Sequence, residues 1–232
     1  MSFNPIRKLD VFRTLSTGKQ VHIGTLAQNN SGVFFQYDPE YLQLCNNLSP
    51  FILKANADLQ VAPQEPHNGL HGVFADCLPD GWGLLLQDRT FRQYDILPAQ
   101  ITAMDRLAFI GNRGIGALSF SPVSEFQPVP QPDEDLYQLG LGAQAVFDGQ
   151  TENVLTALVA AGSSGGERPK AQIFFDASQP DYASTIYRPG DDACIIKFTS
   201  QNLTLGHDEG LCEAIYLEMA KNCNLQPVEY LL

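Results

Sequence analysis

The stretch Gly162-Ser163-Ser164-Gly165-Gly166-Glu167-Arg168-Pro169-Lys170 decides how the second half of this chain is interpreted. Glycine has no Cβ, so Gly162, Gly165 and Gly166 can adopt positive φ and present a concave row of backbone N–H donors to an anion. An apolar run ending in Ile195-Ile196-Lys197 follows, and a lysine at that position can reach a phosphate. The order predicts an ATP-binding site formed by Gly162, Gly165, Gly166 and Lys197.

The elements after this loop are predicted in the order strand, turn, strand, helix. Their expected ranges are Ala171 to Phe175, Ala193 to Phe198, and about Asp208 to Asn222. The order is that of the small lobe of a protein kinase, where a glycine loop covers the phosphates and a strand lysine binds them. The loop is not a Walker P-loop, because Lys170 is followed by Ala171 and not by Ser or Thr.

Lys197 is the only basic residue of its predicted strand, and two orientations fit the spacing equally. In the first, the amine is buried against the loop, where an apolar environment makes an anionic partner necessary. In the second, it points to solvent by simple alternation. The first orientation is the one expected for the ATP site.

In the kinase arrangement a helix glutamate pairs with the strand lysine and positions it. Glu213 is the predicted partner, because it lies at the edge of an apolar stripe formed by Leu211, Ile215 and Met219. Glu209 lies in the first turn and can simply favour the helix N-terminus.

The first half of the chain has an alternating pattern that predicts an antiparallel β-meander or small barrel with helices. Turn residues separate the expected strands, and Asp38-Pro39-Glu40 is typical of a helix start. The expected strands are Leu9 to Leu15, Gln20 to Leu26 and Gly32 to Tyr37, followed by helices Tyr41 to Asn46, Leu84 to Arg92 and Leu97 to Ile110, and by a strand entered through Gly111 to Phe120.

Four prolines between Ser121 and Asp135 mark the expected domain boundary. We predict an α+β protein with a domain at residues 1–125 and a second at 126–232, the latter beginning with helices at about Glu134 to Phe147 and Thr151 to Ala161.

Composition excludes several classes of function. The net charge is −12 with only 14 Lys and Arg, which argues against direct nucleic-acid binding. No apolar run approaches the roughly 20 residues that cross a bilayer, and Met1 to Asp10 does not resemble a signal peptide, so a cytoplasmic protein is expected. No metal site is predicted, because the five cysteines form no C-x-x-C pair and Pro66 and Gly69 interrupt the spacing of His67 and His71.

Three motifs resemble the HipA-like serine/threonine kinase toxins of type II toxin–antitoxin modules, and the resemblance covers nearly the whole chain. Phe74 to Gly83 is similar to the family motif F-x-D-x-L-P-D-G-W-G, and Trp82 within it is expected to fill a core. Gly111 to Phe120 resembles G-R-x-x-x-G-A-L-x-F with Asn112 inserted, and Gly165 to Ala171 resembles G-G-x-R-P-K-A.

The resemblance implies a kinase that uses ATP and Mg²⁺, a HipB-like DNA-binding antitoxin as partner, and a protein substrate of the aminoacyl-tRNA synthetase type. It also implies autophosphorylation of a loop serine, with Ser163 or its neighbour Ser164 as the candidate. A phosphate there would place about two negative charges among the amides that hold ATP.

The family's catalytic aspartate and metal ligands lie in a large helical lobe that would follow Lys221, so no catalytic residue is assigned here. We therefore expect a truncated protein or a lobe supplied by another chain, with the fragment itself inactive. The alternative is a non-catalytic module that docks on a separate kinase chain or an antitoxin. A third interpretation is a soluble α+β domain whose glycine loop is only a turn.

Overall fold

The computed structural model describes residues 3–45, 47–49, 51–130, 134–152, 156–162, 165–176, 178 and 182–232. The chain forms two compact units, Met1–Val129 and Pro130–Leu232. Both units combine an antiparallel sheet with helices, so the α+β class is confirmed.

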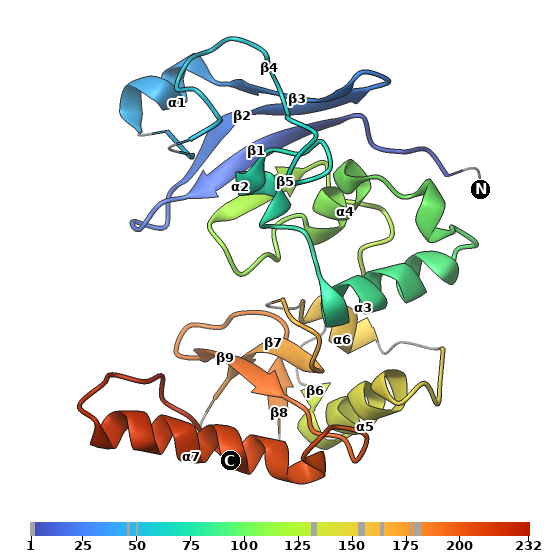
Figure 1. Cartoon of the computed structure of the whole chain (residues 1–232), viewed down its shortest axis with the longest axis vertical. Coiled ribbons are helices and arrows are strands. Elements are labelled where there is room, and N and C mark those ends of the chain that lie inside the picture. The colour runs from blue at the N-terminus through green and yellow to red at the C-terminus, as the bar shows by residue number, and fades with distance from the viewer. Residues whose placement is uncertain are drawn as a thin grey trace. The chain divides into compact units, whose positions relative to one another are not determined.

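The first unit is built on a five-stranded antiparallel sheet in the order β4-β3-β2-β1-β5 (Figure 1). Its strands are β1 (Lys8–Thr14), β2 (Gln20–Asn29), β3 (Gly32–Tyr37), β4 (Gln60–Val61) and β5 (Leu118–Ser121). The predicted meander of the first three strands is confirmed. Strands β4 and β5 are the two edges, so the described strands form an open sheet and not a small barrel.

Helical segments connect the strands of this sheet, and side-chain caps start the first and the last of them. They are α1 (Pro39–Leu44), α2 (Gly72–Ala75), α3 (Gly81–Arg92), the 3₁₀ turn η1 (Pro98–Gln100) and α4 (Ala103–Ile110). The Asp38 carboxylate accepts a hydrogen bond from the Glu40 amide at 2.7 Å, which is the predicted cap of α1. The single helix expected from Leu97 to Ile110 is wrong, because Thr102 and Asp105 form a reciprocal cap that starts α4 separately.

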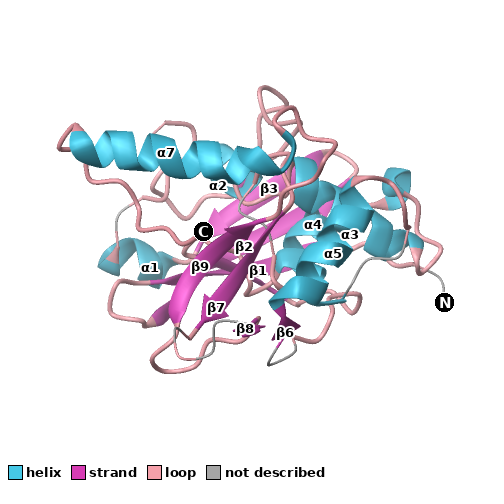
Figure 2. Ribbon diagram, turned by 90° about the horizontal axis from the view of Figure 1, so that it is seen from below, coloured by secondary structure: helices cyan, strands magenta, loops and turns pink. Residues whose placement is uncertain are grey.

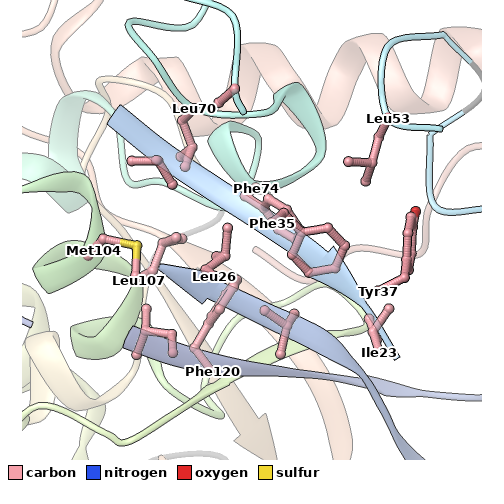
Figure 3. Close-up of a cluster of buried hydrophobic side chains, with 14 of the residues drawn as sticks. Ile23, Leu26, Phe35, Tyr37, Leu53, Leu70, Phe74, Met104, Leu107 and Phe120 are labelled. Carbon is pink, nitrogen blue, oxygen red and sulfur yellow. The ribbon is translucent and has the colours of Figure 1, made fainter. Parts of the chain in front are cut away.

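Aromatic and aliphatic side chains from the sheet and from α2 and α4 form the core of the first unit. Figure 3 shows Phe35 and Phe74 lying against each other, and their ring centroids are 4.8 Å apart. Leu26, Met104 and Phe120 complete the same cluster, and all five of these side chains are buried. Trp82, the second residue of α3, is 1% exposed, so the prediction that it fills a core is confirmed.

His71 is an unusual buried residue of this unit. Its ring is 3% exposed beside Phe35 and Phe74, and neither ring nitrogen has a hydrogen-bond partner among the described residues. Burial lowers the pKa of the imidazole, because a charged ring would lose its hydration. His71 precedes α2 while His67 lies in a turn, so the two do not share a helix.

The second unit contains a four-stranded antiparallel sheet in the order β6-β8-β7-β9. Its elements are β6 (Glu134–Asp135), α5 (Leu136–Phe147), α6 (Thr156–Ala160), β7 (Lys170–Phe175), β8 (Tyr182–Ser184), β9 (Asp192–Lys197), η2 (Gly206–Asp208) and α7 (Glu209–Asn222). Strands β7 and β9 are neighbours in Figure 2, as expected, and α7 confirms the predicted last helix. Strand β8 was not predicted, and Glu134 and Asp135 form a strand instead of the first turn of a helix.

Neighbouring residues at the end of β9 and just after it contact two different helices, α7 and α5. Phe198 lies within van der Waals distance of the position that a Cβ on Gly140 of α5 would occupy. Its neighbour Lys197 contacts Glu213 of α7 instead. Successive side chains of a strand point to opposite faces, which explains how adjacent residues meet different helices.

Candidate nucleotide-phosphate site

The glycine loop connects α6 to β7, and the three predicted glycines all have positive φ. Gly162 has φ +71° and its amide bonds the Val159 carbonyl at 3.3 Å, so it ends α6. Gly165 and Gly166 have φ +82° and +84°, a conformation that side-chain-bearing residues rarely adopt. Two consecutive residues of this kind turn the chain sharply just before β7.

Lys170, the first residue of β7, holds this turn in place. Its side chain is 7% exposed, and its ammonium donates a hydrogen bond to the Gly165 carbonyl. A Cβ on Gly166 would lie 2.9 Å from the same nitrogen, so the glycine permits the close approach. The loop is therefore closed by a charge-assisted bond to a buried cation.

Lys197 is the cross-strand neighbour of Lys170. The two residues face each other in the antiparallel pairing of β7 with β9, so their side chains leave the same face of the sheet. Directly opposed residues have Cβ atoms about 4.5–5.5 Å apart. The two lysines thus face each other beside the glycine loop, with the Lys170 ammonium bonded to the Gly165 carbonyl and the Lys197 ammonium bonded to Glu213.

The Lys197 ammonium lies 2.5 Å from a carboxylate oxygen of Glu213, which projects from α7. This is the pairing that the sequence predicts. The pairing alone does not distinguish a buried Lys197 amine from one that faces solvent. The side chains are 51% and 47% exposed, so the expectation of a buried ammonium at Lys197 is wrong. The buried lysine is Lys170, whose long-range position opposite Lys197 could not be recognised from local spacing.

The apolar stripe used to choose Glu213 has a different environment from the one expected. Leu211, Ile215 and Met219 are each 50–55% exposed, and Ala214 is the buried residue of α7. The helix therefore contacts the sheet through the side that carries Glu213 and Ala214. The choice of glutamate agrees with the geometry, although the apolar stripe is not what covers the sheet.

Arg168 and Glu209 form a second ion pair, which sequence analysis did not identify. The Arg168 Nε atom lies 3.0 Å from Glu209 Oε1, and Glu209 is the first residue of α7. The signal was present in the spacing, because Glu209 and Glu213 are four residues apart and lie on one side of the helix.

The described residues around the glycine loop offer backbone donors and positive charge, which suit an anion. The positive-φ glycines and the two opposed lysines supply N–H donors and positive charge. Among the residues that the structure describes, no group of three His, Cys, Asp or Glu could hold a metal ion. Ser163 and Ser164, the predicted autophosphorylation candidates, lie outside the described residues.

Taken together, the two units define an α+β protein with a candidate anion site at the glycine loop. Residues 17–121 match the family model of the HipA N-terminal domain, so this part of the chain is similar to that domain. Two of the three motifs that suggested the family, Phe74 to Gly83 and Gly111 to Phe120, lie inside the matched segment.

The match ends before the glycine loop, Lys197 and Glu213, so the ATP site stays a prediction. No curated protein and no solved structure matches the chain. Within the described part of the chain, no helix is long and apolar enough to cross a membrane.

Proposed function

We propose that this chain is the nucleotide-holding part of a HipA-type, ATP-dependent serine/threonine protein kinase of the cytoplasm. The observation that carries the proposal is the arrangement of Lys170 and Lys197, which face each other at the base of a glycine loop while Glu213 of α7 contacts Lys197. In kinases of known mechanism, a glycine loop, a strand lysine and a helix glutamate position the phosphates in this way. The similarity of residues 17–121 to the HipA N-terminal domain supports the same family.

In this proposal each residue has a separate task. The amides around Gly165 and Gly166 contact the phosphates, and Lys197 neutralises part of their charge while Glu213 positions its amine. Lys170 keeps the loop in its turned conformation through the Gly165 carbonyl. MgATP would supply the phosphoryl group, and the residues that transfer it are not assigned to this chain.

The proposal extends to regulation and partners. Phosphorylation of Ser163 or Ser164 would add negative charge to the glycine loop and weaken its attraction for a nucleotide. A HipB-like DNA-binding antitoxin is the proposed partner, and a protein of the aminoacyl-tRNA synthetase type is the proposed substrate.

Titration of the purified chain with ATP tests this function. Wild-type protein should bind, and Lys197→Ala should weaken binding by about 10-fold or more, because a hydrogen bond between charged groups contributes about 1.5–3 kcal/mol. Ser163→Asp should also weaken it through charge repulsion. Equal binding by all three proteins would show that the site is elsewhere.

One feature favours a second candidate function, that of a non-catalytic module that docks on a separate kinase chain or antitoxin. The apolar stripe Leu211, Ile215 and Met219 on α7 is about half exposed, which is typical of surfaces that bind other proteins. A pull-down with a candidate kinase chain or antitoxin separates the two functions. Binding that persists in Lys197→Ala and is lost in Ile215→Asp would favour docking without nucleotide.

A further inference from the structure

One side of α7 carries two carboxylates. One contacts the glycine loop, and the other contacts the end of strand β9. Glu209 pairs with Arg168 in the loop, with 3.0 Å between Nε and Oε1. Glu213, one turn further along, pairs with Lys197 at the end of β9, with 2.5 Å between Nζ and Oε2. Residues four apart lie one above the other on a helix, so the same face of α7 contacts the loop and the strand lysine.

The Arg168–Glu209 pair is bonded less completely than its chemistry allows. An arginine can donate two parallel hydrogen bonds to one carboxylate. Glu209 is mostly buried, with 21% of its side chain exposed, yet its Oε2 atom is buried with no partner among the described residues. A buried acceptor without a donor is costly, and a second N–H from Arg168 would remove that cost. A small displacement of the loop relative to α7 would therefore change the energy of this pair.

The short segment around Arg168 transmits such a displacement to the turn of the loop. Pro169 follows Arg168 and fixes its own φ, which limits independent movement of the residues on either side. Lys170 comes next, and its ammonium bonds the Gly165 carbonyl. Arg168 thus lies between the glycine turn and the lysine that closes it.

We propose that Arg168 is a positioning residue that ties the glycine loop to α7 through Glu209. The position of α7 then sets the conformation of the loop, and occupation of the loop by phosphate changes the position of α7, because coupling between two sites is reciprocal. The nucleotide part of this inference rests on the proposed function. The tie between loop and helix exists without a ligand and can be measured alone.

The test is a charge-swap experiment on the whole chain, with Arg168→Glu, Glu209→Arg and the double variant. The first readout is hydrogen exchange of the amides of residues 165–168 without nucleotide. The second is the dissociation constant for inorganic tripolyphosphate. Each single variant should increase loop exchange by about two- to fivefold, the range expected for a partly exposed ion pair, and Arg168→Glu should weaken tripolyphosphate binding by a similar factor. The double variant should recover most of both losses.

Glu218→Gln is the matched control, because Glu218 is an exposed carboxylate on the same helix and should leave both readouts unchanged. If a swapped variant fails to fold, Arg168→Gln, Glu209→Gln and their combination replace it, and non-additive effects on loop exchange then measure the tie. Unchanged loop exchange in the single variants, or additive losses in the double variant, would overturn the proposal. Wild-type protein that does not bind tripolyphosphate would instead overturn the proposed function, while loop exchange still decides whether the tie exists.

Discussion

Replacing Lys170 with methionine separates a role in the glycine loop from a role in stability. Methionine keeps most of the apolar stem and removes the ammonium, which is 7% exposed and bonds the Gly165 carbonyl. The lost bond contributes about 1.5–3 kcal/mol. Two changes oppose this loss, because the variant no longer buries a charge and no longer places it opposite Lys197, a repulsion of roughly 0.2–1 kcal/mol.

We therefore expect the free energy of unfolding to change by only about 1 kcal/mol, as is common when a buried charge is replaced by an apolar group of similar size. The loop should lose its closed conformation, and the affinity for tripolyphosphate should fall about 10-fold or more. Calorimetry measures the affinity, and hydrogen exchange of β7 and β9 reports the local stability of the sheet.

Lys221→Met is the matched control, because it removes the same charge from the last turn of α7. It should leave tripolyphosphate affinity nearly unchanged. The reasoning is refuted if Lys170→Met binds tripolyphosphate as tightly as wild type. It is also refuted if the variant lowers the free energy of unfolding by several kcal/mol, because Lys170 would then be a purely structural residue.

Three further predictions concern the first unit. Acidification should destabilise it through His71, because burial lowers the pKa of this imidazole in the folded state. The contribution of His71 to the free energy of unfolding is complete above the pKa of the unfolded chain, about 6.5. It is lost as the pH falls from there through the folded pKa, at no more than about 1.4 kcal/mol per pH unit. Denaturant unfolding at several pH values, followed by Trp82 fluorescence, measures this loss. Gly24→Ala should destabilise the sheet by about 2 kcal/mol or more, because the new Cβ would lie 2.1 Å from the Gln36 carbonyl oxygen; the same unfolding assay measures it. Asp105→Ala should lower the melting temperature, with a cost of about 2–4 kcal/mol, because the buried carboxylate accepts hydrogen bonds from the Ile6 amide and from the cap of α4.

Each of these has a control or an outcome that contradicts it. His71→Phe should remove the pH-dependent part, and an unchanged slope would assign it to another group. Gly116→Ala, where nothing lies within 4 Å of the new Cβ, should change stability by less than about 0.5 kcal/mol, and equal losses at positions 24 and 116 would contradict the steric argument. Asp105→Asn keeps an acceptor and should cost less than alanine.

Much of the fold could be predicted from the sequence, because strand alternation and helix caps depend on residues that are close together in the chain. Alternation placed β1 to β3, and Asp38 with Pro39 placed α1, since both signals act within a few residues. The break before α4 also had a local signal, the Thr102 and Asp105 cap, which the longer apolar periodicity obscured. Strand β8 has only three residues and too little pattern for recognition.

The candidate site was predictable only in part, because some of its contacts are set by strand register. Glu213 contacts Lys197 as expected, although the apolar stripe that led to this choice does not cover the sheet. The burial of Lys170 was not foreseeable, because it depends on pairing between β7 and β9 and on a bond back to Gly165. Exposure of Leu211 and Ile215 shows the same limit, because an amphipathic pattern does not reveal what covers a helix.

The most direct test of the central claim is an NMR titration of the chain with ATP, with adenosine as the comparison ligand. The account predicts that ATP shifts the amide signals of Gly165 and Gly166 and the side-chain signals of Lys197, and that adenosine leaves them unchanged. Shifts confined to other parts of the chain, or equal shifts with ATP and adenosine, would contradict a phosphate site at the glycine loop.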